Sequence, residues 1–277
     1  MQNTLSPAPL YPQLPLVAFV GGGNIATALI GGLVGCGICG TRTIVIEPSE
    51  TQRLNLIERY QVNAIGAPGE ELRDAGIVVW AVKPQVFASA ARSCRPWLSD
   101  ALHLSVMAGI RAQEVSERTG SLRVTRAIPN TAAAVGKGMS GLYAASDMDS
   151  GDRLLAEAVL AATGRTLWVD RESDLDAVTA LSGSGPAYFL YFVEAMLQAA
   201  RELGLSPSQG RLLAHATLDG TANLFGNSER VPDELRKQVT SPGGTTQAAM
   251  EVLEASDVKG SLIRAIKAAH ARSIQMT

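Results

Sequence analysis

Charged residues are missing from the first 41 positions, and an apolar stretch runs through this region from Leu16 to Gly35. A stretch of about 20 apolar residues can span a bilayer. However, three consecutive glycines, Gly21–Gly23, interrupt it, and each costs a continuous helix about 1 kcal/mol relative to alanine. A secretory signal would also begin with positively charged residues. We therefore interpret the stretch as a strand, a glycine turn and a helix, and expect a protein that is neither exported nor membrane-bound.

The chain also has little net charge and few aromatic residues. The 277 residues include 24 basic and 26 acidic side chains, which leaves a net charge of −2, and 5% are aromatic. Nucleic-acid backbones attract strongly basic surfaces, and unpaired bases stack on aromatic side chains. The composition therefore argues against a nucleic-acid partner. It favours a small molecule or a second copy of this chain.

Cysteine occurs at three positions, Cys36, Cys39 and Cys94. An odd number cannot form a complete disulfide framework, which points to a reducing compartment, and we expect the cytoplasm. Cys36 and Cys39 have the CxxC spacing of redox and metal sites, but no second ligand pair is near in sequence. We interpret them as ordinary loop residues and expect no metal.

Short β-favouring segments alternate with helical stretches up to about residue 170. This alternation predicts βαβ units and a mainly parallel, doubly wound sheet of the Rossmann type. The strand candidates lie within residues 16–20, 43–48, 75–85, 101–109 and 122–130, and further edge strands are candidates within residues 138–146 and 164–170. From Ser173 onward the chain is rich in Ala and Leu with short breaks. We expect a flexible leader at 1–15, the Rossmann domain at 16–171 and an all-helical domain at 172–277.

A G-x-G-x-x-A pattern, formed by Gly21, Gly23 and Ala26, directly follows the first predicted strand and opens a helix. The first glycine permits a tight turn, the second lets backbone approach a pyrophosphate, and the small third residue lets helix and strand pack closely. The helix N-terminus supplies N–H donors to phosphate. The position of the pattern predicts a dinucleotide site.

The end of the second predicted strand is ambiguous about which dinucleotide binds. Glu47 lies 24 positions after Gly23, roughly where an acidic residue accepts the ribose 2′-hydroxyl of NAD. Ser49, Thr51 and Arg53 follow at a helix N-terminus that could hold a 2′-phosphate. These residues are equally suited to capping and solvating that helix. NAD and NADP both stay open here.

Two stretches stand out in the helical half. Residues 181–189, LSGSGPAYF, end one helix and begin another. Residues 239–249, VTSPGGTTQAA, place a Pro-Gly-Gly turn before a helix, so we expect unpaired N–H groups of Gly244, Thr245 and Thr246 to face outward. Such a turn could bind a carboxylate, or it could be an ordinary helix cap.

Several segments, in order and spacing, resemble the pyrroline-5-carboxylate reductase family from Val17 to about Ser273: AFVGGGNIATALIGG, AVKPQ, SVMAGI, IPNT, LSGSGPAY and VTSPGGTTQAAMEVL. The last two are the most specific. The resemblance implies an enzyme that makes L-proline from 1-pyrroline-5-carboxylate with NADPH, or with NADH as the alternative. It also implies a homodimer in which the partner completes the substrate pocket, and rings of dimers occur in the family.

The resemblance also implies roles for single residues. The dinucleotide would contact Val20, Gly21, Gly22, Gly23, Asn24, Ile25, Ser49, Ala81, Val82, Lys83, Pro84, Met107 and Ala108. The substrate would contact Ala108, Gly243, Gly244, Thr245 and Thr246, and Ser182–Gly185 would shape the joint between domains. Hydride would pass from nicotinamide C4 to the imine carbon. We assign the substrate carboxylate to the turn amides and the imine nitrogen to the Thr246 hydroxyl, so that positioning and electrostatics carry the catalysis.

Three positions depart from the family pattern: Met107 replaces a usual alanine, Ala132 replaces the proline of NTP, and Glu47 is unusual before Pro-Ser. A β-hydroxyacid dehydrogenase is a second interpretation, but its catalytic lysine has no counterpart between Asp174 and Arg236. A catalytically silent dinucleotide-binding regulator or redox sensor is a third. It would have no need of the TSPGGTT turn.

Overall fold

The computed structural model describes residues 14–145 and 148–276. Most of the expected leader therefore lies outside the described residues, and Leu14, which falls within its expected bounds, is buried in the core rather than part of a flexible leader. The chain packs as two compact units, Met1–Ser184 with Ala269–Thr277, and Gly185–Ala268. The first unit extends beyond the boundary that we expect at residues 171–172, and this boundary stays a prediction.

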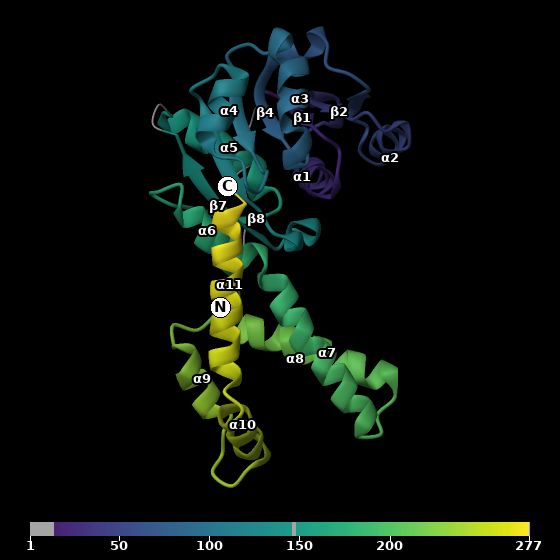
Figure 1. Cartoon of the computed structure of the whole chain (residues 1–277). Helices are drawn as coiled ribbons and strands as arrows, with labels where there is room; N and C mark the ends of the chain where they lie inside the picture. The colour runs from purple at the N-terminus through teal and green to yellow at the C-terminus, as the bar shows by residue number, and fades with distance from the viewer. Residues whose placement is uncertain (1–13, 146–147, 277) are drawn as a thin grey trace. The chain divides into compact units, whose positions relative to one another are not determined.

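The first unit is built on an eight-stranded sheet with the strand order β3-β2-β1-β4-β5-β6-β7-β8 (Figure 1). The strands from β3 to β6 are parallel, β7 runs antiparallel to β6, and β8 is parallel to β7. Their bounds are β1 Leu16–Val20, β2 Thr43–Ile46, β3 Asn63–Ile65, β4 Ala75–Trp80, β5 Leu102–Ser105, β6 Val124–Ile128, β7 Gly138–Ala144 and β8 Gly164–Trp168. The expected doubly wound, mainly parallel sheet is confirmed.

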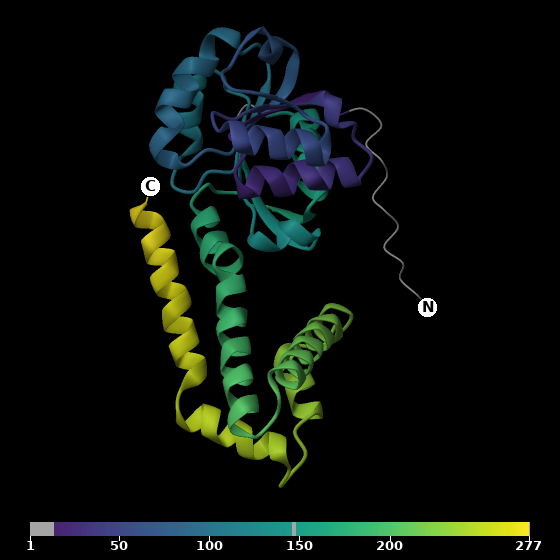
Figure 2. The same cartoon turned by 90° about the vertical axis from the view of Figure 1, so that its right-hand side faces the viewer.

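Helices cover both faces of this sheet. They are α1 Asn24–Gly35, α2 Glu50–Tyr60, α3 Pro84–Cys94, α4 Ala112–Thr119, α5 Ser150–Ala161 and α6 Asp174–Val178. Short 3₁₀ segments are η1 Gly40–Arg42, η2 Glu70–Asp74, η3 Arg95–Trp97 and η4 Thr131–Val135, and η5 Thr179–Gly183 is a π-helix. Figure 2 shows α1 and α2 side by side on one face of the sheet.

Successive strand residues enter opposite cores, because side chains alternate across a strand. Phe19 of β1 packs in a buried cluster with residues of α1, α2 and α5, whereas its neighbour Val20 packs in a second cluster with residues of α3 and α4. The apolar runs of the central strands are explained by this burial on both faces.

The second unit is helical, as expected: α7 Gly185–Glu202, α8 Pro207–Gly226, α9 Pro232–Gln238, α10 Thr245–Ala255 and most of α11 Val258–Gln275. Pro186 lies in the first turn of α7, where its missing N–H leaves no helical bond unmade. The last turns of α11 belong to the first unit, where the Ser273 hydroxyl donates to Asp176 at 2.7 Å.

Two details of the sheet differ from the sequence-based expectations. β3 was not expected, and β7 is an internal strand rather than an edge. The Ser49 side chain caps α2 by accepting from the Gln52 N–H at 3.4 Å, which agrees with the capping role open to it, and Gln52 Nε2 donates to Gly22 O at 2.6 Å. The side chain of Gln52 therefore ties α2 to the glycine loop.

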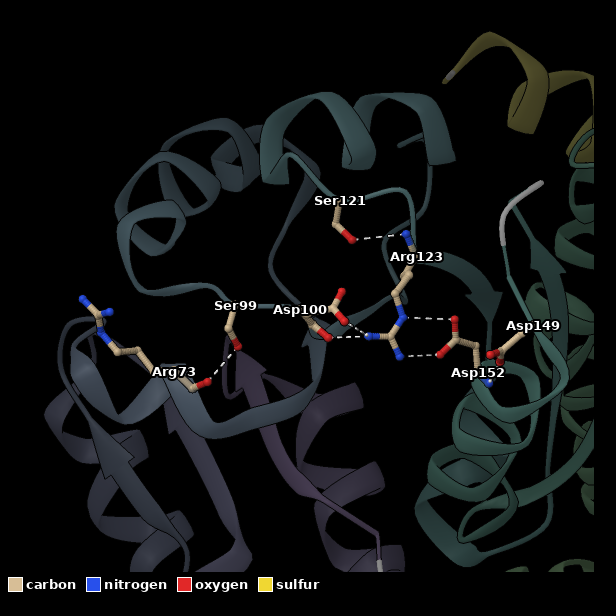
Figure 3. Close-up of polar contacts among 7 residues, drawn as sticks. All are labelled: Arg73, Ser99, Asp100, Ser121, Arg123, Asp149 and Asp152. Carbon is tan, nitrogen blue, oxygen red and sulfur yellow. Dashed lines mark hydrogen bonds and ion pairs between the residues drawn. The ribbon is translucent and has the colours of Figure 1, made fainter.

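An ion pair anchors the approach to β6 (Figure 3). The Arg123 guanidinium donates to both carboxylate oxygens of Asp152 in α5, at 2.6 and 3.1 Å, and also reaches the Asp100 carboxylate at 3.2 Å. Asp152 is buried, whereas the Asp100 side chain is 92% exposed. These contacts raise the pKa of Arg123, chiefly through the hydrogen bonds to Asp152.

Candidate active site

A cavity of about 630 Å³ opens where the strands β1, β2 and β4 end. These are neighbouring parallel strands, and β1 is the point where the chain order of the sheet reverses. Ligands of open α/β sheets bind at such a switch point, outside the carboxyl ends of the strands. The cavity therefore lies where the glycine pattern predicted a dinucleotide.

Gly21 and Gly23 explain why glycine is needed in this loop. Gly21 has φ of +98°, and a Cβ there would lie 2.7 Å from Ala81 O, so a side chain would collide with the end of β4. A Cβ on Gly23 would meet no atom within 4 Å, and Gly23 is the N-cap of α1. The loop thus leaves open space directly before a helix N-terminus, which suits a phosphate.

Six of the predicted dinucleotide residues line this cavity: Val20, Gly21, Gly23, Ala81, Val82 and Lys83. Lys83 is the exposed N-cap of α3, and Pro84 is the first residue of that helix. Because Lys83 is exposed and lines the cavity, its ammonium group can pair with an anionic group of a ligand.

The other predicted residues lie elsewhere. Asn24 and Ile25 line a neighbouring cavity between α1 and η4, Gly22 is a buried residue of the loop, and Ser49 is an exposed helix cap. Met107 is 2% exposed and packs in the core cluster that contains α3, whereas Ala108 is exposed. Gly22, Ser49, Pro84, Met107 and Ala108 are thus not among the residues that line the main cavity.

Glu47, the residue after β2, forms part of the cavity wall. Its carboxylate accepts the Gly22 N–H at 2.9 Å through Oε2 and the Ser49 N–H at 2.9 Å through Oε1. One carboxylate therefore joins the glycine loop to the start of α2 and has a fixed position at the carboxyl end of β2.

Sequence reasoning missed two groups of lining residues. Gly66, Ala67 and Pro68 follow β3, and the three-residue β3 carries too weak a pattern to be predicted. One face of α3 contributes the second group, and its spacing of three and four residues is the signal that could have found them. These residues are Val86, Ser89, Ala90, Ser93 and Cys94.

The predicted substrate turn lies in the second unit, at the start of α10. Gly243 has φ of +71°, and Gly244 is the N-cap. The expectation that the Gly244 amide is unpaired is wrong, because it donates to Ser241 O at 3.0 Å and so closes the turn. The Gly243 N–H donates to Gln247 Oε1 at 2.7 Å.

Thr245 and Thr246 occupy the first two positions of α10, where backbone N–H groups lack intrahelical acceptors. Thr245 is exposed and Thr246 is half-buried. Two consecutive helix-start amides beside a hydroxyl can bind a carboxylate or another anion.

Asn130, from the IPNT segment, connects three elements. Its Nδ2 donates to Ser182 O and Oγ at 3.3 and 3.2 Å, and its Oδ1 accepts from Met139 N at 3.3 Å. Asn130 thereby joins the end of β6 to β7 and to η5. Ser182, predicted to shape the domain joint, is held by this side chain.

Histidine is not among the described residues that line the cavity. His103 is buried in β5, and burial, with a smaller contribution from the Arg123 charge, lowers its pKa to about 4. His215 is exposed in α8 and His270 is half-buried in α11. Across the described ranges, no cluster of His, Cys, Asp and Glu could hold a metal ion, and no helix has the length and apolar character to cross a membrane.

Comparisons with known proteins cover both halves of the chain. A family model described as pyrroline-5-carboxylate reductase dimerisation matches residues 172–276. One described as NADP oxidoreductase, coenzyme F420-dependent, matches residues 16–109. A pyrroline-5-carboxylate reductase from Pseudomonas aeruginosa is 38% identical over 264 residues, which cover 95% of this chain and 97% of the relative.

Two solved structures are similar along nearly their whole length. A pyrroline-5-carboxylate reductase from Coxiella burnetii has a TM-score of 0.89 and 32% identity, covering 96% of this chain and 99% of that chain. A pyrroline carboxylate reductase from Plasmodium falciparum with NADP bound has a TM-score of 0.84 and 28% identity. The match covers 95% of this chain and 98% of that chain.

Proposed function

The chain belongs to the pyrroline-5-carboxylate reductase family, and we propose how its residues perform the reaction of that family. The protein is an oxidoreductase that reduces 1-pyrroline-5-carboxylate to L-proline with NAD(P)H, the last step of proline biosynthesis. The observation that carries this function is the 38% identity to a reductase over 95% of the chain, because it spans both the glycine loop and the α10 turn.

The cavity beside Gly21 fits the dinucleotide. It is bounded by the glycine loop and the ends of β2 and β4, and the open space at Gly23 leaves room for the pyrophosphate. Residues 20–25 would hold the diphosphate and Ser49 the adenosine end. Ala81–Pro84 would hold the nicotinamide ribose, with Met107 and Ala108 beside the ring. When bound, the reduced nicotinamide supplies a hydride to the imine carbon of the substrate.

The α10 turn supplies the substrate contacts. Gly244 bonds within the turn, so Thr245 and Thr246 would donate their N–H groups to the substrate carboxylate, while Gly243 and Gly244 shape the approach. The protonated imine nitrogen would donate its hydrogen to Thr246 Oγ1. Catalysis then depends on orientation and on fixed dipoles rather than on a strong acid.

The protein acts as a homodimer or a larger oligomer, because its helical half is a dimerisation domain. Large apolar side chains of α7 and α8 are exposed in the single chain, and burial in a subunit interface would stabilise them. We extend this to a pocket completed by the partner and to a ring of dimers. We also assign the protein to the cytoplasm, where the free thiols Cys36 and Cys39, both exposed, would stay reduced.

A direct assay tests the function. Purified protein is mixed with 1-pyrroline-5-carboxylate and NADPH or NADH, and the loss of nicotinamide absorbance is followed together with the formation of proline. We expect turnover with this substrate and none with a β-hydroxyacid. Dinucleotide binding without any turnover would instead favour a regulator or redox sensor.

A further inference from the structure

The carboxylate of Glu47 has a fixed position at the adenosine end of the cavity. Its two oxygens accept the N–H groups of Gly22 and Ser49, each at 2.9 Å, and its own N–H donates to Ile65 O at 2.9 Å. Backbone bonds on both sides therefore prevent Glu47 from turning away when a ligand enters.

Two of the groups that could hold a 2′-phosphate, Ser49 and Arg53, already have hydrogen-bond partners. The Ser49 amide donates to Glu47, and the Ser49 hydroxyl accepts from the Gln52 N–H. Arg53 Nη1 donates to the backbone carbonyls of Glu47 and Pro48, at 2.9 and 2.7 Å. Nη1 of Arg53 is thus occupied by backbone, and Arg53 is not among the described residues that line the cavity, although its guanidinium lies beside Gly66, which does line it.

The charged residues of the cavity wall lie on opposite sides of β1. Of the described residues that line it, Glu47 and Lys83 are the charged ones. Lys83 follows β4 and Glu47 follows β2, on opposite sides of β1. On the β2 side, where the adenosine ribose binds in this fold, the charged residue of the cavity wall is therefore a carboxylate. Glu50, in the first turn of α2, is a carboxylate close to Glu47 in the chain but is not among the described residues that line the cavity.

We propose that Glu47 is the specificity-determining residue of this reductase and makes it prefer NADH to NADPH, an inference that rests on the proposed function. A ribose 2′-hydroxyl can donate a charge-assisted hydrogen bond to the carboxylate. A 2′-phosphate carries about −1.5 to −2 charges at neutral pH and meets like charge there.

Wild-type protein gives the first test. Dissociation constants are measured by calorimetry for NADH and NADPH, and for ADP-ribose and its 2′-phosphorylated form, which lack the nicotinamide. We expect the non-phosphorylated member of each pair to bind about tenfold more tightly or better. Values of kcat/KM with pyrroline-carboxylate should favour NADH in the same proportion.

Matched variants show which side chain causes the preference for the non-phosphorylated ligands. Glu47→Gln keeps the side-chain length and removes the charge, and it should narrow both affinity ratios by about tenfold. Glu50→Gln removes the same charge from an exposed position outside the cavity wall, and should leave the ratios within about twofold of wild type. Arg53→Gln should change the affinities for NADH and NADPH alike.

Tighter wild-type binding of NADPH would overturn the proposal, even if Glu47→Gln failed to fold. So would a Glu47→Gln protein with the wild-type ratios, or a selective loss of NADPH affinity in Arg53→Gln. Failure of the proposed function looks different: pyrroline-carboxylate would not be reduced with either cofactor, while the affinities for the ADP-ribose pair could still be measured.

Discussion

Trp80 Nε1 donates a hydrogen bond to His103 Nδ1 across 3.0 Å, and the two rings stack with their centroids 5.9 Å apart. Both side chains are fully buried where β4 and β5 pair. Because Nδ1 accepts, the neutral imidazole carries its hydrogen on Nε2, which has no partner in the part of the chain that the structure describes. His103 is therefore a neutral core residue, and charging it inside the protein is unfavourable.

We expect His103 to make stability depend on pH. Burial lowers its pKa from 6.5 to about 4, so between these values the unfolded chain binds the proton and the folded chain does not. The free energy of unfolding should thus fall as pH drops from 6.5 to 4, by up to about 3 kcal/mol. His103→Gln keeps an acceptor for Trp80 and should flatten this slope in urea titrations at several pH values. Equal slopes in both proteins would contradict the assignment.

The ion pair in Figure 3 predicts unequal costs for two carboxylates that share one guanidinium. Asp152→Asn removes a buried partner of Arg123, and we expect a loss of about 2 kcal/mol, less than for a fully buried pair because the Arg123 side chain is 32% exposed. Asp100→Asn removes a partner that is 92% exposed and should cost about 0.5 kcal/mol. Urea denaturation measures both, and a cost for Asp100→Asn equal to that for Asp152→Asn would contradict the reasoning.

The sequence predicts the central strands well because burial on both faces leaves an unbroken apolar run, as in Leu16–Val20. It misses β3 because a three-residue strand that begins with the exposed Asn63 carries neither an apolar run nor an alternation. The position of β7 inside the sheet could not be predicted either, since it depends on β8 pairing alongside it, far along the chain.

Some features of the candidate site could likewise be predicted from the sequence, and others could not. The glycine spacing predicts the loop, because the constraint at Gly21 comes from backbone geometry. The two amide bonds of Glu47 could not be predicted, because they depend on how the loop after β1 meets the start of α2. The Gly244 amide was misjudged because its acceptor, Ser241 O, becomes available only in the folded turn.

Gly23→Ala should separate binding from stability. The new Cβ would meet no protein atom within 4 Å, and the extended backbone of Gly23 accepts alanine, so the melting temperature should stay close to that of wild type. The methyl group would occupy the space proposed for the pyrophosphate, so we expect dinucleotide affinity to fall about tenfold or more. Calorimetry with NADH and thermal unfolding measure the two effects.

Gly35→Ala is the matched control, because its Cβ would also meet nothing and it lies at the far end of α1. Its affinity for NADH should equal that of wild type. An unchanged affinity in Gly23→Ala would place the diphosphate elsewhere.

Thr246→Val should test the substrate site at a single group. Valine keeps the branched shape and the backbone N–H at the second position of α10 and removes only the hydroxyl. If Thr246 Oγ1 orients the imine nitrogen, kcat/KM should fall about 100-fold, the scale of losing one preorganised polar partner. Thr246→Ser retains the hydroxyl, and its kcat/KM should stay within about tenfold of wild type.

A Thr246→Val enzyme with a raised KM and normal kcat would restrict the hydroxyl to binding, and one with unchanged kcat/KM would exclude it from the site. The amide survives in both variants, and Thr246→Ser loses the γ-methyl group but keeps Oγ1, so a large loss of kcat/KM in Thr246→Val that is absent in Thr246→Ser belongs to the hydroxyl.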